Sequence, residues 1–139
     1  ITTKRQKESN IMTIEERAAR AVEIKASCNC AQAVALAFAD KLPLPEETLK
    51  KLTAGCGGGM GCMEATCGAL VGAVLVEGLL TDGQATGRYA KATLTRFRER
   101  CGATVCKDLK GVETGKVLCP CNECVRSAVL AAGEALGEN

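Results

Sequence analysis

Hydrophobic residues recur three and four positions apart along most of the chain, and this spacing predicts α-helices rather than strands. One such stripe joins Cys30, Val34 and Phe38. The longest stripe, near the C-terminus, consists of Cys121, Cys124, Val125, Ala128, Val129, Ala132 and Leu136. No sustained alternation of polar and apolar residues, the mark of a half-buried strand, interrupts these stripes. We therefore expect an all-α fold, a compact bundle of about five to six helices with a Gly/Cys-rich loop.

Capping residues and prolines mark where the predicted helices begin. Thr13 and Glu16 fit a capping box at the start of a first helix, and Asn29 is a suitable N-cap for a second. In a later helix, Gly68 and Gly72 form a face on which another helix can approach closely. The predicted helices cover approximately residues 14–26, 30–41, 46–53, 64–80, 83–100, 104–110 and 120–136.

The polar residues 1–12 lack this periodicity, so we expect them to be a disordered extension of a single helical Cys-rich domain spanning residues 13–139. A net charge of +2 and an aromatic content of 2% argue against binding to nucleic acid. No apolar run approaches the roughly 18 residues of a membrane span, and no signal-peptide core is visible. These features predict a cytoplasmic protein that associates with neither a membrane nor nucleic acid.

The chain has ten cysteines and no histidine, which excludes histidine-based catalysis and histidine metal ligands. Helical periodicity favours metal-binding or redox cysteines over a disulfide framework. The ends of predicted helices matter here, because unpaired N–H groups and the helix dipole lower the pKa of a thiol and stabilise an anionic cluster. The cysteines near predicted helix starts are Cys30, Cys67, Cys106 and Cys121. The other six are Cys28, Cys56, Cys62, Cys101, Cys119 and Cys124.

Residues 54–69, AGCGGGMGCMEATCGA, hold six glycines and three cysteines. The segment lacks the Lys-Ser/Thr ending of a P-loop and follows no predicted strand, which argues against a nucleotide site. A flexible linker between helices is one interpretation. The other is a nest of backbone N–H groups around an anion, which beside three cysteines would be an iron–sulfur cluster or a metal–thiolate centre. The candidate nest residues are Gly57, Gly58, Gly59 and Gly61.

Several of these motifs, taken in order, resemble one known family. Cys67-Gly68-Ala69-Leu70-Val71-Gly72 has the form C-G-A-x-x-G, and the resemblance extends over about residues 13–136. The other matching pieces are Asn29-Cys30-Ala31-Gln32-Ala33-Val34, Gly57-Gly58-Gly59-Met60-Gly61, Cys106 with Leu109 and Gly111, and Cys121 before Val125-Arg126. The chain is similar to the C_GCAxxG_C_C family of redox-active proteins. The resemblance implies a small helical protein whose signature cysteines, here Cys30, Cys67, Cys106 and Cys121, bind an iron–sulfur group.

This chain departs from the family pattern by carrying cysteine at positions 56, 62 and 101. Four thiolates suffice for one [2Fe–2S] or [4Fe–4S] cluster, so six extra thiols lead us to expect a [4Fe–4S] cluster or larger, or a second cluster. The expected function is electron transfer or small-molecule reduction, with an unidentified redox partner protein and a homodimer as a possible assembly. Two alternatives remain. One is a soft-metal (Cu/Zn) thiolate binding or storage protein, and the other is a thiol–disulfide oxidoreductase that uses Cys121 and Cys124 or a C-x-C pair at a helix start.

Overall fold

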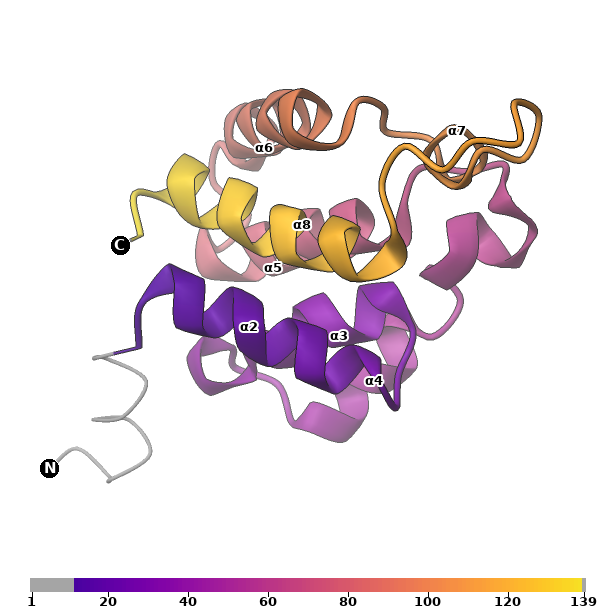
Figure 1. The fold of residues 1–139 in the computed structure, drawn as a ribbon. Coiled ribbons are helices and arrows are strands. Elements are labelled where there is room, and N and C mark those ends of the chain that lie inside the picture. Colours follow the sequence, from indigo (N-terminus) through magenta and orange to yellow (C-terminus); the bar gives the residue numbers. More distant parts are fainter. Residues whose placement is uncertain (1–11, 139) are drawn as a thin grey trace, which may run out of the picture.

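The computed structural model describes residues 12–138, and within this range it is all-α, as the periodicity predicts. The predicted extension at residues 1–12 lies outside the described residues except for Met12. Six helices have at least eight residues, and shorter turns connect them (Figure 1). The elements are α2 (Ile14–Lys25), α3 (Cys30–Ala37), η1 (Ala39–Lys41), α4 (Glu46–Thr53), η2 (Gly59–Met63), α5 (Gly68–Leu80), α6 (Thr86–Cys101), α7 (Cys106–Lys110) and α8 (Cys121–Leu136).

Helix α8 is the centre of the bundle. It packs against α6 on one side and α2 on the other, while α3 and α5 form a second close pair that also contacts α8 (Figure 1). The figure shows α7, the magenta segment around η2 and the start of α8 at the same end of the bundle, away from the C-terminus. This arrangement brings residues that are distant in sequence to one end of the molecule.

Both predicted N-caps are confirmed, but the capping box predicted at Thr13 and Glu16 is only half formed. The Thr13 side chain accepts a hydrogen bond from the Glu16 N–H, and α2 begins at Ile14, directly after Thr13. Asn29 and Gln32 form a full capping box at the start of α3, because each side chain bonds the backbone N–H of the other residue. These caps fix the residue at which α3 begins, and that residue is Cys30.

Three predicted boundaries are wrong. Helix α6 begins at Thr86 rather than near Gly83, because Asp82, Gly83 and Ala85 all have positive φ and cannot continue a helix. Helix α3 ends at Ala37, and a 3₁₀ turn replaces its predicted last turn. Helix α5 begins at Gly68 rather than near residue 64, because Thr66 forms an isolated antiparallel bridge with Val105 and the Cys67 N–H bonds the Thr104 carbonyl at 2.8 Å. Cys67 is therefore the N-cap of α5 and does not lie in its first turn.

The predicted close approach at Gly72 is confirmed, and it sets the distance between α3 and α5. A Cβ added at Gly72 would lie 2.7 Å from the Ala31 carbonyl oxygen, so only glycine permits this separation. Ala31 follows Cys30, and Gly72 lies one turn beyond Gly68. The packing therefore sets how far apart the starts of α3 and α5 lie.

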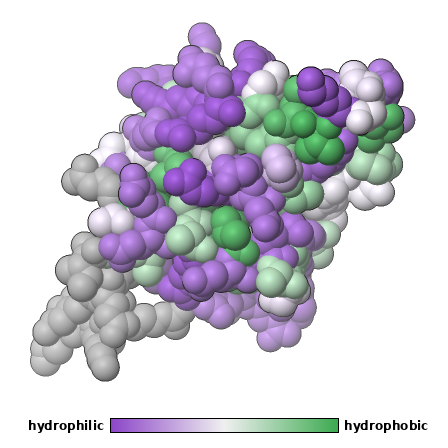
Figure 2. Space-filling model, in the orientation of Figure 1, coloured by the Kyte–Doolittle hydropathy of each residue, from purple (hydrophilic) through white to green (hydrophobic). Residues whose placement is uncertain are grey.

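The surface is mostly hydrophilic on the face drawn in Figure 2, and hydrophobic surface gathers at the upper right, the end that carries α7. The exposed large hydrophobic residues of η2 and of the chain after α7 are Met60, Met63, Val112, Val117 and Leu118. Within residues 12–138, no helix has the length and hydropathy that crossing a bilayer requires.

Candidate metal centre

Four cysteines from four different helix starts line one pocket at the α7 end of the bundle. Cys30, Cys106 and Cys121 are the first residues of α3, α7 and α8, and Cys67 is the N-cap of α5. The pocket has a volume of about 150 Å³. Its lining residues are Lys25, Asn29, Cys30, Gly58, Cys67, Gly68, Cys106, Lys110, Cys121 and Cys124. The fold therefore brings together the four cysteines that the sequence placed at helix starts.

The four positions differ in how far they are covered. Cys30, Cys67 and Cys106 are buried, whereas Cys121 is exposed although it begins the longest apolar stripe. The next cysteine of this stripe, Cys124, is 1% exposed, so the stripe becomes buried one turn into α8. The pocket thus has three covered thiols and one at its rim.

The glycine-rich segment packs directly against these cysteines. A Cβ at Gly59 would lie 2.6 Å from the Cβ of Cys106, and one at Gly68 would lie 2.6 Å from both the Cys30 Sγ and the Cys56 carbonyl oxygen. Gly58, Gly59 and Gly61 have φ between +59° and +77°, a region that favours glycine. Of the predicted nest residues, Gly58 lines the pocket, Gly59 packs on Cys106 and Gly57 packs on Asn29. Gly61 has open space around its Cα and does not line the pocket.

The environment of Cys67 favours its thiolate form. A hydrogen bond with Cys124 and the backbone N–H groups of Ala69 and Leu70 together lower the pKa of Cys67 to about 7, although burial acts to raise it. These two N–H groups belong to the first turn of α5, as expected for a thiolate at a helix start. Burial, with the nearby charge of Cys67, raises the pKa of Cys106. Cys67 therefore ionises readily. Ionising Cys106 beside it costs more free energy unless a cation is present.

A second group of thiols lies beside this pocket. The Sγ atoms of Cys101, Cys119 and Cys124 all lie within 4.8 Å of one another, and all three side chains are buried. They come from the end of α6, the chain before α8 and the first turn of α8. Among the described residues, no other set of three candidate ligands is as close together. This buried group could hold a metal ion, and we call it the three-cysteine group.

Cys124 connects the two sets of thiols. It lines the pocket, and its thiol donates to the Cys119 carbonyl oxygen at 3.5 Å. Hydrogen bonds with Cys101 and with Cys67, together with burial, strongly raise its own pKa. The same bond lowers the pKa of Cys101 to about 6 against the effect of burial. Burial, followed by the hydrogen bond with Cys101, raises the pKa of Cys119 to about 11. The pKa values of Cys67 and Cys101, one from each set, are therefore both lowered by the same residue, Cys124.

Lys110 is a residue of the site that the sequence reasoning missed. Its Nζ donates to the Cys119 carbonyl oxygen at 3.3 Å and lies 3.9 Å from the Cys124 Sγ. Burial acts to lower the pKa of Lys110, but a hydrogen bond with Cys121 and the charges of Cys124, Cys121 and Cys67 outweigh it and raise the pKa. The sequence held a signal for this residue, because Lys110 follows Cys106 by four positions and shares its helix face.

Three cysteines belong to neither set. Cys28 and Cys56 are half-buried, and the exposed Cys62 thiol donates to the Gly59 carbonyl oxygen at 3.6 Å. The sequence reasoning gave most weight to Cys56 and Cys62 as extra ligands. The extra thiols that the fold brings together are instead those of the three-cysteine group.

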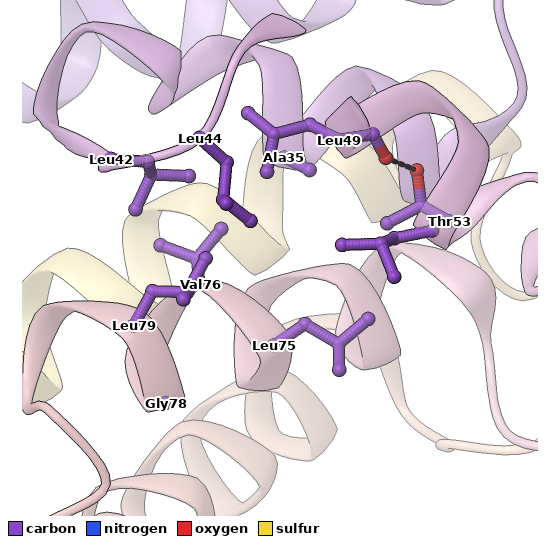
Figure 3. Close-up of a pocket in the computed structure, with 10 residues that line it drawn as sticks. Ala35, Leu42, Leu44, Leu49, Thr53, Leu75, Val76, Gly78 and Leu79 are labelled. Atoms are coloured by element: carbon purple, nitrogen blue, oxygen red, sulfur yellow. Dashed lines mark hydrogen bonds between the residues drawn. The ribbon is translucent and has the colours of Figure 1, made fainter. Parts of the chain in front are cut away.

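A larger pocket elsewhere has a different chemistry. Figure 3 shows leucine and valine side chains from three segments converging on a cavity of about 320 Å³ between α3, α4 and α5. The one polar side chain among its lining residues, that of Thr53, donates to the Leu49 carbonyl oxygen at 2.7 Å. Its lining residues include no cysteine, so it is not a candidate metal site.

Comparison with known proteins supports the interpretation of the cysteines. No curated protein and no solved structure matches the chain. The family model described as "Putative redox-active protein (C_GCAxxG_C_C)" matches residues 28–135, a range that includes every element from α3 to α7 and nearly all of α8. All ten cysteines lie within the matched range. The chain is therefore a cysteine-rich member of the C_GCAxxG_C_C family of redox-active proteins.

Proposed function

We propose that the chain is a redox protein that binds an iron–sulfur cluster in the pocket lined by Cys30, Cys67, Cys106 and Cys121. The observation that carries this proposal is that four helix starts, separated along the sequence, present their cysteines to one pocket. Four thiolates are the usual ligand set of a [2Fe–2S] or [4Fe–4S] cluster. The donor set therefore fits the group.

The residues around the pocket suit an anionic cluster. N–H groups at the start of α5 point at the Cys67 sulfur, and Lys110 places a positive charge beside Cys121. Such hydrogen bonds and charges set the reduction potential of a cluster, and burial of three of the four thiols limits access of water. When bound, the cluster would supply one-electron chemistry. The chain's own residues would hold it, neutralise it and leave the Cys121 side open.

The direct test is anaerobic purification of the full chain, with iron and acid-labile sulfide counted per chain and a paramagnetic-resonance spectrum of the reduced protein. We expect about four irons and an equal amount of sulfide at the signature pocket. Protein that binds neither iron nor sulfide after anaerobic purification and reconstitution contradicts the proposal. Activity of the metal-free chain on a test dithiol would favour the thiol–disulfide alternative instead.

Metal beyond one four-cysteine site is the second part of the proposal. Cys124 lines the pocket and also belongs to the three-cysteine group, so the extra thiols adjoin the proposed cluster. A larger cluster would raise the iron count above about four per chain, whereas a separate soft metal would appear in addition to iron. The same elemental analysis distinguishes the two.

We propose that a second copy of the chain covers the α7 end. Exposed hydrophobic residues lie there, on η2 and on the chain after α7, two segments that directly follow Gly58 and Lys110 of the pocket lining. Shielding this surface would remove apolar area from water and protect the cluster. Light scattering of wild type and Leu118→Glu tests it: the wild type should be dimeric and the variant monomeric. A monomeric wild type contradicts it and leaves the surface to a redox partner.

A further inference from the structure

The three-cysteine group differs from the signature pocket in the spacing of its thiols. Two thiolates bound at 2.3 Å to one ion lie about 3.8 Å apart at a tetrahedral angle and about 4.0 Å apart at a trigonal one. The Sγ atoms of Cys101, Cys119 and Cys124 lie within 4.8 Å of one another, close to that spacing. In a [4Fe–4S] cluster each cysteine binds a different iron atom, which requires wider separation. The signature thiols do not form such a close group.

From this spacing we infer that Cys101, Cys119 and Cys124 form a separate site for a single divalent soft-metal ion of the zinc type. The site is dry, since Cys101 and Cys119 are 5% exposed and Cys124 is 1% exposed. Thiolates at this density in a buried setting select soft or borderline cations over magnesium or calcium. None of the three cysteines belongs to the signature set, although Cys124 also lines the signature pocket.

The charge around the group favours a divalent ion. Three thiolates around a divalent ion leave one negative charge, which the Lys110 Nζ, 3.9 Å from the Cys124 Sγ, partly offsets. Glu123 adds a further negative charge near Cys101, so the group favours the ion of higher positive charge. A monovalent ion such as Cu(I) would leave two negative charges in the same buried volume, against a single neighbouring lysine. Burial of uncompensated charge is costly, so the divalent ion is the better match.

The backbone at all three cysteines is held by the fold before any ion arrives. Cys101 ends α6, and the Cys119 N–H bonds the Leu109 carbonyl oxygen at 3.2 Å. The Cys124 N–H bonds the Pro120 carbonyl oxygen in the first turn of α8. Helices α6 and α8 pack closely against each other, so the core fixes the positions of Cys101 and Cys124. Little ordering is then needed on binding, and a preformed site favours affinity.

The test uses the full chain, purified anaerobically, exposed to Zn(II) and then dialysed against metal-free buffer. Zinc and iron are counted by elemental analysis. We expect wild type to retain about one zinc per chain in addition to its iron. Cys101→Ala and Cys119→Ala should retain at least tenfold less zinc, with unchanged iron and an unchanged helical circular-dichroism spectrum. Cys62→Ala, which changes an exposed thiol outside both sets, should retain zinc as wild type does.

The two proposals fail in different ways. Three results would overturn the three-cysteine site: zinc retained at the wild-type level by both variants, no zinc in wild type, or iron lost together with zinc. If the chain binds no iron, the proposed cluster fails, and the loss of about one zinc between wild type and the variants still tests this site. Two variants are used because Cys119 lies outside the helices, so Cys119→Ala is informative even if Cys101→Ala unfolds the end of α6.

Discussion

The two ends of α5 each carry a buried acidic group, and their pKa values move in opposite directions. At the start, Cys67 has its pKa lowered to about 7 by the hydrogen bond with Cys124 and by backbone N–H groups. Near the end, Glu77 is fully buried, and burial raises its pKa from 4.5 to about 7, with only the Thr93 hydroxyl acting against the rise. The Oε1 of Glu77 has no hydrogen-bond partner among the described residues.

The contrast teaches that burial alone does not decide whether an acid ionises. Burial raises the pKa of an acid, and hydrogen-bond donors to the charged form reverse that effect. A helix start offers free N–H groups, whereas a helix interior has already used its own. Only the Cys67 end of α5 is therefore built to hold negative charge, which is what a thiolate-bound metal centre requires.

The largest effect should come from Cys67→Ser. A serine hydroxyl is a poor iron ligand, and at pH 7 it stays protonated, so this end of α5 loses the negative charge it is built to hold. We expect iron per chain to fall at least tenfold in anaerobically purified protein. Cys62→Ser is the matched control, since Cys62 is exposed and lines no part of the pocket, and should keep its iron. Unchanged iron in Cys67→Ser would show that the signature pocket is not the cluster site.

Gly68→Ala should have the next largest effect, because Gly68 is the first residue of α5 and also lines the pocket, where the substitution adds a methyl group. The new Cβ would meet the Cys30 Sγ and the Cys56 carbonyl oxygen, each at 2.6 Å, and the carbonyl cannot rotate away. Overpacking of this kind costs about 3 kcal/mol. We expect lower stability in urea unfolding and less iron per chain. Wild-type values for both would mean that the glycine segment does not set the pocket's shape.

The same helix shows what sequence can and cannot predict. Local signals placed Cys30 at the start of α3 through the Asn29 cap, and the glycine spacing indicated the close approach at Gly72. The start of α5 was missed because it depends on a long-range bridge to Val105. The three-cysteine group was missed as a group because tertiary packing, rather than sequence spacing, brings its members together.

The opposite end of α5 should respond to pH rather than to metal. Because the folded pKa of Glu77 is about 7 and its ordinary value is 4.5, folding takes up a proton between these values. The stability that Glu77 contributes is therefore greatest below about pH 4.5 and is lost as pH rises through 7. Glu77→Gln removes the charge and should stabilise the chain by about 3 kcal/mol at pH 8, with little change at pH 4.5. Urea unfolding at the two pH values measures this.

Iron content is the control for Glu77→Gln, because the substitution lies three turns along the helix from Cys67 and should leave the metal unchanged. A variant whose stability gain is the same at pH 4.5 and pH 8 would show that Glu77 does not titrate between these values.

The smallest effect should come from a pair of identical substitutions on α5. Gly78 lies in the helix, and a Cβ there would meet nothing within 4 Å, so Gly78→Ala should stabilise the chain by about 0.5–1 kcal/mol through its effect on the unfolded state. Gly72→Ala should instead destabilise it by about 1–3 kcal/mol, because its Cβ would meet the Ala31 backbone. Thermal unfolding of both variants measures the difference. Equal shifts would mean that α3 and α5 can separate freely, and the spacing of Cys30 and Cys67 would then not be set by this contact.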